Sequence, residues 1–329
     1  MSAVTVVMYH YVRDPARTRY PGLKALSVEA FEGQLDYITR HYTVCRPRDV
    51  IAAARGEGPL PPRPCLLTFD DGFLDHFTVV FPRLVDRGLG AGFYPPVAVV
   101  EGRRVLDTHK VQLVLAVAPE AEKLARRILD MLDGFRDEHR LPSGEEIYRT
   151  HARASRFDGP DVVFVKRVLQ HALPPAVRSS IAARLFEEYV GVEESTVARE
   201  LYMDEAQLRC LIAAGLEVGG HGAEHLWLDS LPRVEQAREI ERTVHFLERL
   251  HGRRPRDWVM CYPFGSYDDV TLDLLREAGC ALGLTTRVAL AHDLTTPLTL
   301  PRLDTNDLPT RGDAPPNAWT AEAAGGRDG

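Results

Sequence analysis

Short apolar runs alternate with longer amphipathic segments along most of this chain. Apolar runs of this length, bounded by glycine, proline or polar residues, are typical of buried strands. We predict seven such strands: Val4–Met8, Cys65–Phe69, Ala91–Tyr94, Leu216–Gly219, Trp258–Tyr262, Cys280–Thr285 and Leu298–Arg302. Most are separated by segments long enough to hold a helix, which favours parallel pairing.

Apolar residues three and four positions apart predict helices between these strands. The first helix follows Ser27, a suitable N-cap, and carries Phe31, Leu35 and Ile38 on one face. Strands that alternate with helices indicate an α/β fold, and a ring of parallel strands buries both faces of its sheet. We therefore predict a distorted (β/α)7-type barrel of parallel strands. The other predicted helices are Phe77–Arg87, Glu205–Ala214, Pro232–His251 and Asp269–Ala278.

The same pattern divides the chain into parts. Residues 101–199 carry long Arg- and Glu-rich amphipathic stretches without strand-like alternation, which predicts a helical insertion in a barrel formed by residues 1–100 and 200–309. Such an insertion can act as a lid or specificity element, or as a dimerisation or packing element, and the sequence favours neither. Residues 310–329, rich in glycine, alanine, proline and aspartate, are expected to be disordered.

Composition narrows the function classes. The formal charge is −7 with a pI near 6.0, and no dense Lys/Arg block is present, so a nucleic-acid partner is not expected. The five cysteines are odd in number and scattered, which suits reduced core residues better than a disulfide framework. The N-terminus lacks the pattern of a signal peptide, and no apolar run has the ~20 residues of a transmembrane segment. We expect a cytoplasmic protein.

Adjacent carboxylates follow the second predicted strand, in the segment Thr68–Gly72. The side chains of Asp70 and Asp71 point in different directions at a strand exit, so one can bind a metal while the other accepts a proton. An Asp-Asp-Gly tripeptide is also common in simple turns, and by itself the segment favours that interpretation.

Two histidines four residues apart, His221 and His225, follow the fourth predicted strand. Gly219, Gly220 and Gly222 make a helix unfavourable at the start of this segment, so His221 is expected in a loop. One carboxylate and two imidazoles form a common metal-binding set that leaves positions for water and substrate. In parallel-strand barrels chemistry lies at the carboxyl ends of the strands, which favours a function over surface histidines.

These motifs resemble those of the polysaccharide deacetylases, the carbohydrate esterases with a NodB-homology domain. Thr68–Gly72 is similar to the first motif of the family, and His221–His225 is similar to the second. Cys261–Gly265 is similar to the third, an Arg-x-Pro-Tyr pattern that lines the substrate groove. The likeness covers most of the chain outside the insertion and the tail, and the first two motifs are the specific ones.

The resemblance implies a role for each matched position. Asp70 corresponds to the catalytic base, and Asp71, His221 and His225 correspond to the ligands of one divalent metal ion. The ligand set suits zinc, but also cobalt, nickel, iron or manganese. Phe264 would offer its backbone N–H to the oxyanion of the tetrahedral intermediate.

The chain departs from the family pattern at two places. Cys261 stands where the family often has the arginine that orients the base, and Arg302, at the end of the seventh predicted strand, can approach Asp70 instead. An equally good interpretation is a surface arginine paired with Asp304. The family's late Leu-x-His motif, which supplies the general acid, is missing, and His10 after the first predicted strand is the preferred substitute.

The resemblance implies a metal-dependent hydrolase that removes an acyl group, most simply N-acetyl, from an amino sugar or a glycosylated biosynthetic intermediate. The substrate would be a small-molecule or lipid-linked sugar, for which Tyr94, Trp227 and Tyr262 are candidate stacking surfaces. Two alternatives stay open: another amide hydrolase on the same fold, such as a deformylase or cyclic imide hydrolase, and a catalytically inactive carbohydrate-binding homologue. A homo-oligomer formed through the insertion is a further option.

Overall fold

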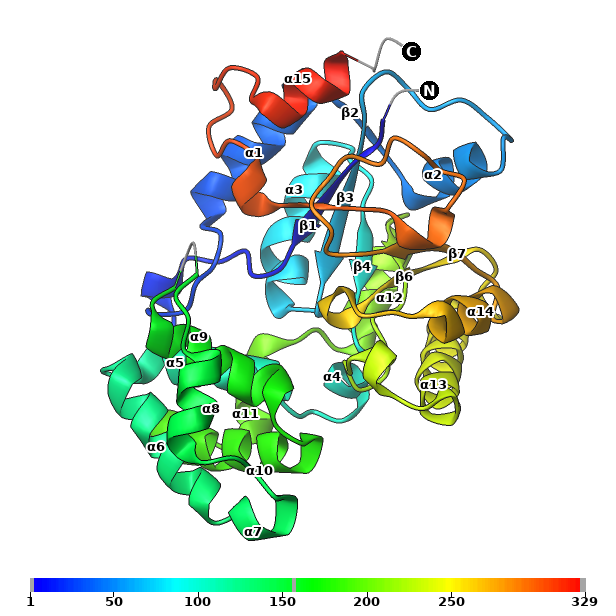
Figure 1. The fold of residues 1–329 in the computed structure, drawn as a ribbon. Helices are drawn as coiled ribbons and strands as arrows, with labels where there is room; N and C mark the ends of the chain where they lie inside the picture. Colours follow the sequence, from blue (N-terminus) through cyan, green and yellow to red (C-terminus); the bar gives the residue numbers. More distant parts are fainter. Residues whose placement is uncertain (1–2, 156–157, 326–329) are drawn as a thin grey trace. The chain divides into compact units, whose positions relative to one another are not determined.

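Parallel strands form the centre of the fold, shown in the computed structural model of Figure 1, which describes residues 3–155 and 158–325. The main sheet has the strand order β5-β4-β3-β1-β8, and β2 pairs with the start of β3. Strands β6 and β7 form a second parallel pair. The strands are β1 (Thr5–Tyr9), β2 (Thr43–Cys45), β3 (Pro64–Asp70), β4 (Gly92–Tyr94), β5 (Glu217–Val218), β6 (Trp258–Cys261), β7 (Cys280–Leu284) and β8 (Leu303–Asp304).

Single parallel bridges join the two sheets into a ring. Gly220 pairs with Met260 between the ends of β5 and β6, and Leu284 pairs with Leu300 between β7 and the segment that leads into β8. The ring therefore runs β1-β3-β4-β5-β6-β7-β8, and it is distorted where only one bridge holds neighbours together. This confirms the predicted distorted seven-stranded barrel of the α/β class.

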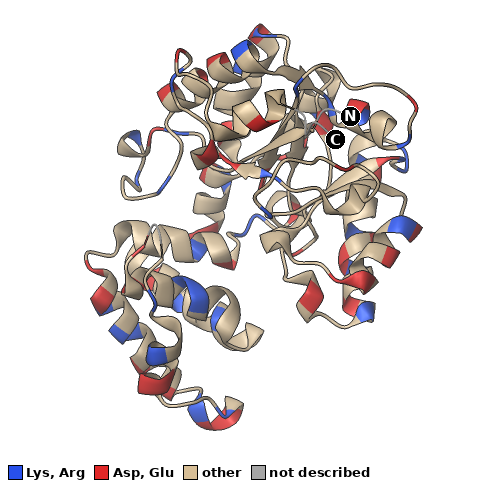
Figure 2. Cartoon of the chain, turned by 45° about the horizontal axis from the view of Figure 1, so that its top comes forward, with Lys and Arg blue, Asp and Glu red and all other residues tan. Residues whose placement is uncertain are grey.

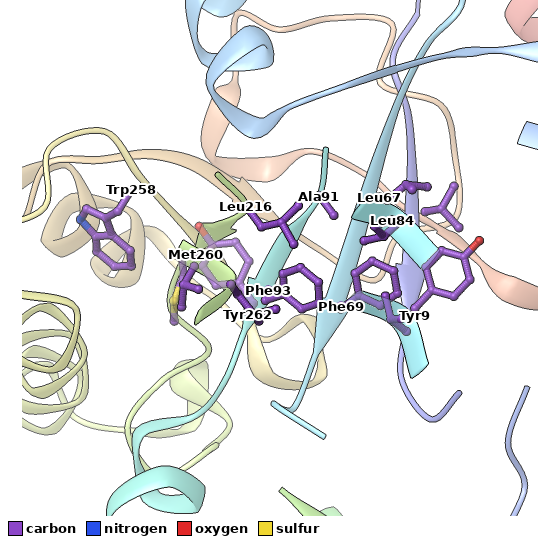
Figure 3. Close-up of a cluster of buried hydrophobic side chains, with 14 of the residues drawn as sticks. Tyr9, Leu67, Phe69, Leu84, Ala91, Phe93, Leu216, Trp258, Met260 and Tyr262 are labelled. Atoms are coloured by element: carbon purple, nitrogen blue, oxygen red, sulfur yellow. The ribbon is translucent and has the colours of Figure 1, made fainter. Parts of the chain in front are cut away.

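Alternating side chains on the strands fill two separate cores. Leu67 and Phe69 of β3 pack outward against the helices, together with Phe93 of β4 (Figure 3). Leu66 of the same strand belongs to a second cluster, which includes Leu282 of β7. Because neighbouring residues of a strand point to opposite faces, Asp70 points to the opposite side from Phe69.

Two strand predictions need correction. The three-residue strand β2 was not predicted, because so short a run carries no clear alternation. The last predicted strand, Leu298–Arg302, is instead a 3₁₀ turn at Pro297–Thr299 followed by a single bridge at Leu300, and β8 begins only at Leu303. Pro297 and Pro301 lack backbone N–H groups, which opposes a continuous strand there.

Helices follow most of the ring strands, as predicted. The side chain of Ser27 accepts a hydrogen bond from the N–H of Ala30 and so begins the first helix, and Asp204 with Gln207 forms a capping box for α12. The helices around the strands are α1 (Val28–His41), α2 (Pro47–Ala54), α3 (Phe81–Asp86), α4 (Val97–Glu101), α12 (Glu205–Ala213), α13 (Arg233–His251) and α14 (Asp269–Glu277).

The predicted helix Phe77–Arg87 has an irregular start. Its first part is a π-helical turn, His76–Val80, in which the N–H of Phe81 donates to the carbonyl of His76, and α3 follows. Pro82 has no N–H to offer the preceding turn, and this interrupts the regular α-helical bonding. Single π turns of this kind occur often near functional sites.

The chain forms two compact units. One comprises Met1–Asp14, Ala25–Arg104 and Ala198–Gly329 and holds all the described strands, and the other comprises Pro15–Lys24 and Val105–Val197. The second unit is helical, and the colouring of Figure 2 shows acidic and basic residues interspersed along its helices. Its α-helices are α5 (Asp107–Val117), α6 (Ala121–Asp133), α7 (Arg136–His139), α8 (Gly144–His151), α9 (Pro160–Arg167), α10 (Pro175–Leu185) and the first half of α11 (Glu194–Leu201).

The described part of the C-terminal segment, residues 310–325, is ordered, so the expectation of a disordered tail is wrong for this part. Helix α15 (Ala318–Ala324) is capped by the side chain of Asn317, and Thr320 and Ala323 are buried. The small apolar face of this helix packs into the barrel's outer core, which composition alone does not reveal. Among the described helices, none is both long and apolar enough to cross a membrane.

Candidate active site

Three loops meet where β3, β5 and β6 end. Asp71, His225 and Phe264, one from each loop, have φ angles of +69°, +58° and +59°. This left-handed conformation costs a non-glycine residue roughly 1–2 kcal/mol, so the surrounding structure has to hold it. Such positions cluster at functional sites.

The predicted metal ligands converge at this point. The Oδ1 atom of Asp71 lies 3.4 Å from Nε2 of His221 and 3.4 Å from Nε2 of His225, and the ligand atoms of all three residues lie within 4.8 Å of one another. Zinc bonds of about 2.0–2.2 Å at tetrahedral angles would separate ligand atoms by roughly 3.4 Å. The spacing and chemistry of this donor set therefore fit one divalent ion.

The imidazole of His221 is oriented by the neighbouring strand. Its Nδ1–H donates to the carbonyl of Cys261 at 2.8 Å, which leaves Nε2 as the ligand atom on the side of Asp71. Burial lowers the pKa of His221, but the carboxylates of Asp71 and Asp70 outweigh it, and the net pKa is raised. A site that attracts a proton to a buried imidazole also favours a cation.

Asp70 is held by a buried arginine. Nη1 of Arg302 donates to Oδ1 of Asp70 at 2.9 Å, and Nη2 lies 2.8 Å from Oδ2, so the guanidinium grips both carboxylate oxygens. Burial raises the pKa of Asp70, but Arg302 and His221 more than offset it, and the net pKa lies below its usual value. Asp70 is therefore ionised at neutral pH, as a base must be.

Arg302 occupies the space that an arginine at position 261 would fill in the third motif. Its Nε donates to the carbonyl of Thr285 at 2.9 Å, and Nη1 lies 3.3 Å from Sγ of Cys261. The small cysteine leaves room for a guanidinium that comes from the segment just before β8. Arg302 is 1% exposed, which rules out the alternative of a surface arginine paired with Asp304.

His10 lies at the edge of the same cluster. It follows β1, its side chain is 41% exposed, and its Nε2 lies 4.0 Å from Oδ2 of Asp71. An imidazole in this position can reach both solvent and the carboxylate of Asp71. The backbone carbonyl of His10 accepts a hydrogen bond from Nε2 of His76 at 2.8 Å.

The aromatic candidates are placed differently from one another. Tyr262 is fully buried and its hydroxyl donates to the carbonyl of Leu298, and Tyr94 is 1% exposed. The prediction that these two rings offer a face to a sugar is therefore wrong. The Tyr262 ring packs in the outer core with Phe93, and the Tyr94 ring packs in the second cluster with Leu66. Trp227 is partly exposed and stacks on Phe264, with ring centroids 4.5 Å apart, and the Phe264 ring packs edge-on against His225.

Two further buried polar residues lie near the site, and Glu239 among them was not predicted. His76 is fully buried and hydrogen-bonds to the backbone carbonyl of His10. Glu239 of α13 is 5% exposed and accepts a hydrogen bond from the loop between the two ligand histidines. For Glu239 a signal existed: it falls on the buried stripe of α13, in step with Gln236 and Thr243. A carboxylate at a core-facing position indicates a specific partner.

Comparison with known proteins agrees with the motifs. A family model described as "Polysaccharide deacetylase" matches residues 183–283, a range that includes His221–His225 and Cys261–Gly265 but not Thr68–Gly72. No curated protein sequence matches the chain.

Solved structures share the fold over nearly the whole chain. IcaB from Ammonifex degensii is 19% identical, with a TM-score of 0.57 and 98% of each chain covered. The Streptococcus pyogenes deacetylase PplD, solved in complex with acetate, is 15% identical, with a TM-score of 0.56 and 92% of each chain covered. A de-N-acetylase from Aggregatibacter actinomycetemcomitans is 16% identical, with a TM-score of 0.53, over 92% of this chain and 95% of that one.

At these identities the solved structures speak for the fold alone, and the family model adds the sequence pattern of the second and third motifs. The family model points to the same group of proteins as the motifs do. The match and the shared barrel confirm that the chain resembles the polysaccharide deacetylase family.

Proposed function

We propose that this protein is a metal-dependent hydrolase that removes an N-acetyl group from an amino sugar. The observation that carries the proposal is the buried cluster of Asp71, His221 and His225, with the ionised Asp70 beside it. A sequence pattern and a fold shared with deacetylases support the acyl group as the target.

The three ligands would hold the ion, which supplies Lewis-acid stabilisation of negative charge and lowers the pKa of a nearby water. Asp70 accepts the proton of the attacking water, and Arg302 keeps both carboxylate oxygens in place while this happens. The N–H of Phe264 donates to the oxyanion that forms from the acyl oxygen. His10, exposed at the edge of the cluster, returns a proton to the leaving amine.

Acetate release tests the proposal. The substrates are a panel of acetamido oligosaccharides and nucleotide sugars, and the proteins are the wild type and Asp70→Asn. We expect wild-type activity that a chelator abolishes and added metal restores, and a loss of at least ~100-fold in the variant, which is the usual contribution of a positioned general base.

The matched control is Asp273→Asn, at an exposed position whose carboxylate pairs with Arg276 on the same helix. It should keep full activity. Equal turnover by Asp70→Asn and the control would contradict the assignment of the base, and wild-type release that survives complete metal removal would contradict the metal-dependent mechanism.

A further inference from the structure

The turn between the two ligand histidines is buried and tightly bonded through its backbone. The first turn of α4 donates to two of its carbonyls: the N–H of Val97 to Gly222 at 3.2 Å, and the N–H of Ala98 to Ala223 at 2.8 Å. Buried backbone groups nearly always need such partners. The carbonyl side of the turn is thus held by the start of a helix.

The N–H side of the turn is held by one carboxylate. Oε2 of Glu239 accepts from the N–H of Ala223 at 2.9 Å and from the N–H of Glu224 at 2.9 Å. Two successive N–H groups that converge on one anionic oxygen form a small anion-binding nest. Hydrogen bonds to a charged acceptor are also stronger than bonds between neutral groups.

The backbone of the turn suits this arrangement. Gly222, at φ +71°, has no side chain, and a Cβ there would lie 3.4 Å from Oε2 of Glu239 and 3.3 Å from Pro263. His225, at φ +58°, ends the turn in the same left-handed region. The conformation that aims both imidazoles at Asp71 is therefore not one that the segment prefers by itself.

The other carboxylate of the turn has a different environment. Glu224 pairs with Arg242 at 2.7 Å and also with Arg104, at the protein surface. Glu239 is 5% exposed and is anchored in the middle of the nineteen-residue helix α13. Glu239 therefore connects the turn to a long helix of the barrel, whereas the ion pairs of Glu224 are screened by solvent.

We propose that Glu239 is a positioning residue that fixes the metal-binding turn, so that His221 and His225 are preorganised for the ion. This inference rests on the proposed function, because it assigns a use to the same metal site. Loss of Glu239 leaves the N–H groups of Ala223 and Glu224 without their acceptor. The turn then no longer fixes the positions of the two imidazoles relative to each other.

Affinity for Co²⁺, measured by competition with a chelator, tests the inference without reference to activity. Glu239→Ala should bind Co²⁺ about 10- to 100-fold more weakly than the wild type, the usual effect of removing a residue that supports metal ligands. Glu239→Gln keeps an acceptor oxygen without the charge and should fall between the two. Glu241→Ala, at an exposed position of the same helix, is the matched control and should bind like the wild type.

A folded Glu239→Ala protein that binds Co²⁺ as tightly as the wild type would overturn the inference and leave the proposed function intact. Failure of the proposed function would look different: Asp71→Ala would then bind Co²⁺ as well as the wild type does. Hydrogen exchange of the metal-free wild type gives a test that needs no variant. The amides of Ala223 and Glu224 should be strongly protected, and rapid exchange at both would overturn the role of Glu239 even if Glu239→Ala does not fold.

Discussion

At the scale of single residues, the site depends on buried polar groups that have specific partners. His76 shows how strongly burial acts on such a group. Its ring lies among Phe69, Phe73 and Phe93, and its Nε2–H donates to the carbonyl of His10. Desolvation by this aromatic surrounding lowers the pKa of His76 to about 4 from its usual 6.5.

This shift predicts a dependence of stability on pH. The unfolded chain binds a proton at His76 below about pH 6.5, whereas the folded protein resists protonation down to about pH 4. The contribution of the neutral His76 to the free energy of unfolding is therefore fully present above pH 6.5. It is lost as the pH falls toward 4, and the loss reaches about 3 kcal/mol. Urea unfolding of the metal-free protein at pH 7 and pH 4 measures the loss.

The matched variant is His76→Gln, whose amide can donate to the carbonyl of His10 but does not titrate in this range. Its decline in unfolding free energy between the two pH values should be smaller than that of the wild type by up to about 3 kcal/mol. The same decline in both proteins would mean that His76 is not a buried neutral imidazole.

At the scale of elements, the C-terminal helix α15 is a stabilising part of the barrel. The hydroxyl of Tyr37, on α1, lies 2.7 Å from Oγ1 of Thr320, and the hydroxyl of Tyr42 donates to the same atom at 2.8 Å. Thr320 also donates to Asn317, the N-cap of its own helix. One buried hydroxyl thus joins two segments that are far apart in the sequence.

Thr320→Val keeps the shape of the side chain and removes this hydroxyl. We expect the free energy of unfolding to fall by about 1–3 kcal/mol, because the hydroxyl of Tyr42 then lacks its acceptor in a buried place. Thr39→Val, at an exposed position of α1, is the control and should change stability by no more than about 0.5 kcal/mol. Equal stability of the two variants in urea unfolding would contradict a structural role for the docked helix.

At the scale of the whole molecule, local patterns revealed the elements and the motifs, but not their long-range partners. The barrel strands are short apolar runs, and Asp71 and His221 follow them directly, so the pattern of the sequence was enough. Glu239 and Thr320 act on segments many residues away, and only folding shows what they contact. Tyr262 was misjudged because its place in a groove-lining motif said nothing about the direction of its side chain.

Asp71, from the early part of the sequence, and His221 and His225, from the later part, are expected to share one divalent ion. Anomalous diffraction from crystals of the Co²⁺-loaded protein tests this expectation most directly. We expect a single strong peak about 2.0–2.2 Å from a carboxylate oxygen of Asp71 and from Nε2 of His221 and His225. An ion bound elsewhere, with no peak among these three side chains, would contradict it.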